Sequence, residues 1–160
     1  MESLDIQIGI YFRGGASLAD QISEWSTNTS NHNFYYIDTK TDTAWNTIST
    51  NTCPKNCVDY QHWDIISIQQ GSIASVGYDN YVTEARELIG LIHDEVDYPF
   101  TLAWNININR ASSGSDYTAI ANTILGNIEN ICKREPVDII FPYGTAIFDA
   151  RTNATLGQIG

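Results

Sequence analysis

Short apolar strands alternate with long amphipathic helices along the second half of the chain, and this alternation constrains the fold most strongly. Asp64 to Ile68 is typical of a strand covered on both faces. The range 80–96 repeats apolar residues at helical spacing, a second strand follows at 100–106, a second helix at 116–134, and a last strand at 137–144. Such βαβ units predict an α/β fold with a mostly parallel sheet and helices on both faces.

The first part of the chain predicts one more strand and helix. Asp5 to Phe12 has the alternation of a strand, and it ends at a glycine turn, Gly14-Gly15. Ser17 can cap a short helix that begins directly after it. The polar range 27–57 contains two short β-like pieces around a turn-prone segment, so we expect a surface hairpin there within a single domain over 1–160.

Composition and charge exclude several classes of function. The chain has 42% apolar residues and no apolar run of the roughly 18 residues that a membrane helix needs. Its formal charge is -11, which would repel both a nucleic acid backbone and an anionic membrane. The first residues lack the basic and apolar regions of a secretory signal. We therefore expect a globular domain with no nucleic acid or membrane partner, in a compartment that the sequence leaves open.

Cys53 and Cys57 lie close together in a predicted loop, and three interpretations are open. They form a local disulfide, they bind a metal together with His62, or they are two free thiols. No fourth metal ligand is evident nearby, so the sequence predicts no metal and no other cofactor. Cys132 lies on the apolar side of the last helix and is expected to be a small core residue.

Polar residues follow four of the predicted strands, at the edge where open α/β sheets bind ligands. They offer carboxamides, hydroxyls, aromatic rings and backbone N–H groups beside glycines, which suits a neutral polyhydroxylated or ester ligand. They include no paired carboxylates for glycosidase chemistry and no phosphate loop. The residues are Arg13, Gly14, Gly15, Gln69, Gln70, Gly71, Ser72, Trp104, Asn105, Asn107, Asn109, Tyr143, Gly144 and Thr145.

A catalytic serine needs a nearby base, usually histidine, and the sequence offers none for Ser72. His62 precedes its strand and therefore belongs to the opposite edge, and His93 lies on the polar side of its helix. His32 falls in the hairpin range, where it is the histidine with the most freedom of position. No catalytic residue is evident, and Ser72 is a weak candidate.

The order of several short motifs resembles the central and later portion of the SGNH (GDSL-type) hydrolase superfamily, within it an uncharacterised bacterial group. The motifs are GGASL, YYI, WDIISIQQGS, LAWN and IIFPYGTAIFDART. The resemblance implies a flavodoxin-like, three-layer α/β/α fold and hydrolysis of esters or acyl groups, often acetyl groups on carbohydrates. It also allows a location outside the cytoplasm.

The resemblance also implies roles for particular residues. Gly15 matches the glycine of the oxyanion hole after the second strand, and Gln69 to Ser72 match the block after the third strand, where Gln70 is our choice for the amide. Arg151 belongs to the block of the fifth strand and is a candidate for orienting a substrate carboxylate. The Gly-Asn-Ser block of the nucleophile and the Asp-x-x-His block are absent from these 160 residues, so we expect a partial domain that is inactive by itself.

The missing first strand of the resemblance leads to a structural expectation. In the strand order 2-1-3-4-5 that strand would lie between Asp5–Phe12 and Asp64–Ile68. These two strands should therefore pair directly or leave a gap that another chain fills.

Three functions remain open from the sequence. They are a hydrolase-type domain that acts on a small-molecule or glycan ester, a non-catalytic carbohydrate-binding module, and an assembly protein whose open sheet edges pair between copies.

Overall fold

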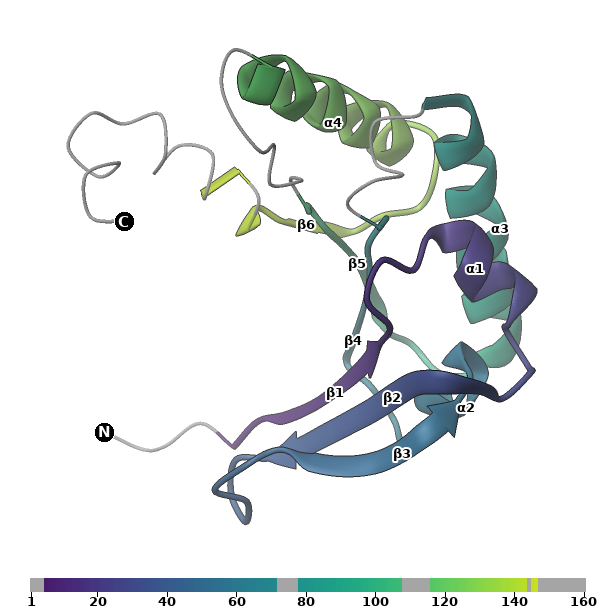
Figure 1. The fold of residues 1–160 in the computed structure, drawn as a ribbon, viewed down its shortest axis with the longest axis vertical. Coiled ribbons are helices and arrows are strands. Elements are labelled where there is room, and N and C mark those ends of the chain that lie inside the picture. Colours follow the sequence, from purple (N-terminus) through teal and green to yellow (C-terminus); the bar gives the residue numbers. More distant parts are fainter. Residues whose placement is uncertain (1–4, 72–77, 108–115, 144, 147–160) are drawn as a thin grey trace, which may run out of the picture.

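The computed structural model describes residues 5–71, 78–107, 116–143 and 145–146, which fold into strands and helices in the α/β class that the sequence predicts (Figure 1). The elements in chain order are β1 (Gln7–Phe12), α1 (Leu18–Ser23), β2 (Thr29–Asp38), β3 (Asn46–Thr52), α2 (Pro54–Val58), β4 (Ile65–Ile68), α3 (Tyr78–Glu95), β5 (Thr101–Asn105), α4 (Asp116–Cys132) and β6 (Ile139–Phe141). None of the helices described is long and apolar enough to span a membrane.

The strands form two sheets. β4, β5 and β6 are parallel and lie in that order, as the βαβ pattern predicts. β1, β2 and β3 form a separate antiparallel sheet, so the expectation that Asp5–Phe12 belongs to the parallel sheet is wrong. The physical reason is the length of β2, which pairs with every residue of β1 from Gln7 to Phe12 in unbroken register.

The range 27–57 contributes to this antiparallel sheet. It holds β2 and β3, which pair as a hairpin with irregular register near Phe34, and it ends in the short helix α2. The aromatic ring of Trp63, just before β4, lies against β1 at Gly9. A Cβ atom at Gly9 would lie 2.6 Å from that ring, so the close approach requires glycine.

A capping box fixes the start of α1. The Ser17 hydroxyl accepts a hydrogen bond from the Asp20 backbone N–H, while the Asp20 carboxylate accepts one from the Ser17 backbone N–H at 2.8 Å. Hydrogen bonding by the Ser17 backbone is the main cause that holds the pKa of Asp20 below its ordinary value. The cap therefore sets the direction in which the chain leaves the glycine turn.

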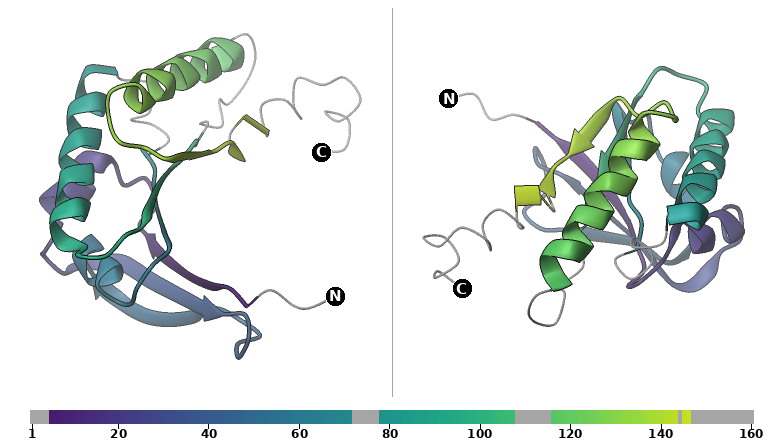
Figure 2. Two further views of the ribbon diagram at one scale, coloured as in Figure 1. Left: turned by 180° about the vertical axis from the view of Figure 1, so that it is seen from behind. Right: turned by 90° about the horizontal axis from the view of Figure 1, so that it is seen from above.

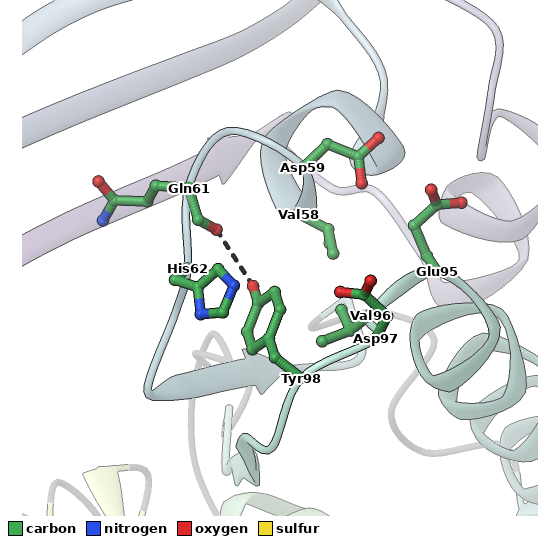
Figure 3. A pocket seen from close by; sticks show the side chains of 8 residues that line it. All are labelled: Val58, Asp59, Gln61, His62, Glu95, Val96, Asp97 and Tyr98. Atoms are coloured by element: carbon green, nitrogen blue, oxygen red, sulfur yellow. Dashed lines mark hydrogen bonds between the residues drawn. The ribbon is translucent and has the colours of Figure 1, made fainter.

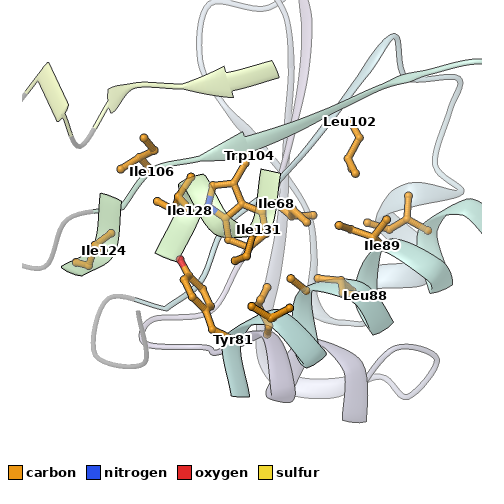
Figure 4. Close-up of a cluster of buried hydrophobic side chains, with 14 residues drawn as sticks. Ile68, Tyr81, Leu88, Ile89, Leu102, Trp104, Ile106, Ile124, Ile128 and Ile131 are labelled. Atoms are coloured by element: carbon orange, nitrogen blue, oxygen red, sulfur yellow. The ribbon is translucent and has the colours of Figure 1, made fainter. Parts of the chain in front are cut away.

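One apolar core lies between the parallel sheet and the helices α1, α3 and α4. Figures 1 and 2 show α3 and α4 on the same side of this sheet, and Figure 4 shows the side chains that fill the space between them. Trp104, on the central strand β5 of this sheet, is fully buried there. The core comprises Leu18, Ile68, Tyr81, Val82, Ala85, Leu88, Ile89, Ile92, Leu102, Trp104, Ile106, Ile124, Ile128 and Ile131.

Candidate functional site at the carboxyl edge of the strands

Two carboxamides from neighbouring parallel strands meet where these strands end. Asn105, the last residue of β5, donates from Nδ2 to the Oε1 atom of Gln69, which directly follows β4, at 2.9 Å. Asn105 is half-buried, and its Oδ1 atom has no hydrogen-bond partner among the described residues. The structure thus brings together two of the predicted site residues and leaves one amide acceptor unused.

Gln70 has a different environment from Gln69, although the two are adjacent. Its side chain is buried, and its Oε1 atom accepts hydrogen bonds from the backbone N–H groups of Leu18 at 2.8 Å and Gly71 at 2.9 Å. Its Nε2 atom donates to Glu84 on α3 at 3.3 Å. The amide of Gln70 therefore joins α1, α3 and the loop after β4, and this use within the protein favours Gln69 and Asn105 as the groups that face a ligand.

Glycines allow the loops after β1 and β4 to touch. A Cβ atom at Gly71 would lie 2.5 Å from the carbonyl oxygen of Ala16, and Gly15 has a φ of +77°, which favours glycine. The Gln21 side chain on α1 also donates to the backbone carbonyl of Gln69 at 3.4 Å. The predicted residues Gly15, Gln69 and Gly71 thus lie in one group of contacting loops.

The remaining predicted site residues are less closely associated with this group. A hydrogen bond at 3.1 Å from the Ile106 backbone N–H to the Phe141 carbonyl joins the end of β5 to β6. Tyr143 follows β6 with 63% of its surface exposed, and Thr145 is half-buried nearby in sequence. Ser72, Asn109, Gly144 and Arg151 lie outside the described residues.

His32 is buried rather than free. Only 1% of its surface is exposed, and its Nδ1 atom lies 2.7 Å from the hydroxyl of Tyr11. Its Nε2 atom lies 3.2 Å from the Oε2 atom of Glu24, without the alignment of a hydrogen bond. The sequence signal that could have placed this ring inward is the two-residue spacing between His32 and the apolar Phe34, because residues two apart in a strand share one face.

Arg13 joins the same group of side chains. Its guanidinium lies 3.2 Å from both carboxylate oxygens of Glu24 and 3.7 Å from Asp20. Burial, followed by the charge of Glu24, raises the pKa of Tyr11 well above its ordinary value. These contacts direct the Arg13 guanidinium to the carboxylates of Asp20 and Glu24 on and just after α1.

Two open hollows lie at the amino end of the strands, opposite the carboxamide pair. The first, of about 320 Å³, is shown in Figure 3, where the ring of His62 stacks on that of Tyr98 at 3.5 Å and the Tyr98 hydroxyl donates to the Gln61 carbonyl. Asp59 and Glu95 beside it both pair with Lys55. The second, of about 510 Å³, lies between the start of β1 and the residues that lead into β4.

Cys53 and Cys57 are free, buried thiols in the structure. Of the three interpretations left open by the sequence, the structure therefore has the two free thiols and no disulfide. Cys53 caps α2 and Cys57 lies in its last turn, where its Sγ atom faces the Cys53 carbonyl oxygen at 3.4 Å rather than the other sulfur. Burial raises the pKa of the Cys57 thiol to about 12. No group of three potential metal ligands lies together in the part of the chain that the structure describes.

The thiols provide a first testable prediction. At pH 8 the folded Cys132→Ser variant should react with a disulfide reagent at least about 100-fold more slowly than the urea-unfolded variant, because both remaining thiols are buried and the raised pKa of Cys57 leaves little thiolate there. Absorbance of the released thiolate measures this rate. When the variant is unfolded without reductant, the reagent should titrate two free thiols, those of Cys53 and Cys57. If it titrates no free thiol, the two cysteines form a disulfide.

Comparison with known proteins supports the fold. No family model matches the chain, and a search of curated proteins finds no match either. The structure is similar to the crystal structure of a DUF4886 family protein from Bacteroides uniformis ATCC 8492, with a TM-score of 0.79 and 22% sequence identity. The match covers 95% of this chain and 61% of that one. At this identity the likeness shows a shared α/β fold, and this chain spans less than two thirds of the length of its structural neighbour.

Proposed function

We propose that this chain is part of an ester or acyl hydrolase-like domain of SGNH type, and that its carboxyl edge binds an uncharged ester of a carbohydrate. The observation that carries the proposal is the carboxamide pair of Gln69 and Asn105, held beside the glycine loops after β1 and β4. Amides supply both donors and acceptors without charge, which matches the hydroxyl and ester oxygens of such a ligand. The motif order of the SGNH superfamily supports the same assignment.

The arrangement favours binding over turnover by this chain alone. Acyl transfer to a serine needs a base within hydrogen-bond reach. Among the described residues, His32 is enclosed between Tyr11 and Glu24, while His62 lies at the amino end of the strands. The same observation supports the second candidate, a carbohydrate-binding module without catalysis.

Replacing Asn105 by alanine tests the site. We expect wild-type protein to bind an acetylated xylo-oligosaccharide saturably, and Asn105→Ala to bind it about tenfold more weakly, the value of one lost hydrogen bond. Titration calorimetry measures both affinities. Asn130→Ala is the matched control, because Asn130 is an exposed asparagine on α4 whose side chain donates to the Gly126 carbonyl of its own helix.

Two further outcomes separate the candidates. The same protein should not release nitrophenol from a chromogenic acetate ester, and turnover by the purified chain would contradict our placement of the catalytic groups. Binding of the unacetylated oligosaccharide with equal affinity would favour the carbohydrate-binding module over the ester-specific domain. If wild type and Asn105→Ala bind the oligosaccharide with equal affinity, the carboxamide pair does not contact the ligand, and the proposed site is wrong.

A further inference from the structure

β1 and β4 are both outer strands within the described part of the structure. β1 pairs only with β2, and β4 pairs only with β5. Each strand therefore has a row of backbone N–H and C=O groups on its other edge without a strand partner in the ranges described. Such an open edge is a template for a further strand.

The two strands run in the same direction along one opening. Their amino ends share the hollow of about 510 Å³, which is lined by Ile6 and Gln7 from β1's side and by Asp64 and Ile65 from β4's side. The segments that follow their carboxyl ends are joined, because the backbone N–H of Leu18, at the start of α1, donates to Oε1 of Gln70. In Figure 1 the carboxyl end of β1 lies next to β4. The opening is thus flanked by two parallel strands that do not pair with each other.

An unusual row of exposed apolar residues lies along β1. Ile6, Ile8, Ile10 and Phe12 alternate along the strand and therefore share one face, and each is between 39 and 51% exposed. Ile65 at the start of β4 is 46% exposed. Apolar residues on an open edge strand are a site for association with another segment.

Charge at the amino end of the opening restricts what can enter it. Asp5, Asp38 and Asp64 line the hollow together with one cation, Lys40, which pairs with Asp5 at 3.4 Å. This acidic entrance attracts a basic group. It disfavours a second copy of this chain, which would bring a formal charge of -11 toward another -11.

We propose that the opening between β1 and β4 binds one extended peptide segment as an additional parallel strand. The segment is apolar along its length and carries basic residues at its amino end, beside the three aspartates. Its backbone pairs with the free edges, and its side chains on one face lie directly beside Ile8 and Ile10 of β1. This proposal does not depend on a ligand at the carboxamide pair.

A synthetic peptide tests the proposal. The probe is a fluorescein-labelled peptide with two lysines followed by alternating valine and isoleucine, and fluorescence anisotropy measures its binding to the full chain. We expect saturable binding that the double variant Ile8→Ser, Ile10→Ser weakens at least about tenfold, because the apolar contacts are lost. Ile48→Ser, an equally exposed isoleucine on the far strand β3, should bind like wild type.

Changes to the peptide keep the test independent of variant folding. A peptide N-methylated at alternate residues lacks the backbone donors along one of its two edges and should bind wild-type protein at least about tenfold more weakly. Equal binding of the methylated peptide would overturn the strand pairing. No binding of either peptide would overturn the proposal, as would a dimer in light scattering that the double variant abolishes, since a second copy would then occupy the opening.

Discussion

Trp104→Ala is expected to lower the free energy of unfolding by about 3 to 5 kcal/mol, the loss typical of truncating a buried aromatic side chain. Trp104 is fully buried on the central strand β5, and its ring meets that of Tyr81 edge to face with centroids 5.6 Å apart. Helices α3 and α4 both contact the core on this side of the sheet (Figure 4). Removing the indole leaves a cavity that neither helix can fill alone.

Urea denaturation followed by circular dichroism measures this loss. Trp45→Ala is the control, because Trp45 is 46% exposed in the segment between β2 and β3, and its removal should cost less than about 1 kcal/mol. Since small domains have about 5 to 15 kcal/mol of stability, Trp104→Ala should also be partly unfolded at modest urea concentrations. Equal losses for the two variants would contradict the central role of Trp104.

Helices and parallel strands could be predicted from the sequence because their signals are local. The helices observed at Tyr78–Glu95 and Asp116–Cys132 carry an apolar repeat over several turns, and strand β5 lies between them. Pairing of β1 could not be predicted in the same way. It depends on β2, a partner more than 20 residues away, whose first half reads as a polar loop.

Positions at the candidate site could be predicted, but their roles could not. Because the carboxyl ends of parallel strands meet at one edge of a sheet, the strand order predicts that Gln69 and Asn105 lie close together, and the hydrogen bond between them confirms this position. Alternation along the chain also indicates that Gln69 and Gln70 point to opposite sides. The alternation does not predict which of the two glutamines contacts α1, because this depends on how the glycine turn and the Ser17 cap direct α1 against β4.

Gln70→Leu is therefore expected to act on stability. The substitution keeps a side chain of similar length and removes the acceptor of two backbone N–H groups, those of Leu18 and Gly71, and the donor to Glu84. Each buried donor left without a partner costs about 1 to 3 kcal/mol, so the free energy of unfolding should fall by roughly 2 to 4 kcal/mol after local relaxation. Urea denaturation measures this change.

The adjacent glutamine gives the matched control and separates the two roles. Gln69 is exposed, so Gln69→Leu should leave the free energy of unfolding within about 0.5 kcal/mol of wild type while it weakens binding of the acetylated oligosaccharide. Gln70→Leu should instead reduce the free energy of unfolding. The fraction that remains folded should still bind the oligosaccharide, because the Gln70 amide of the wild type faces α1 rather than the ligand. The opposite result, a stable Gln70→Leu variant that no longer binds, would return Gln70 to the oxyanion role that the SGNH resemblance implies.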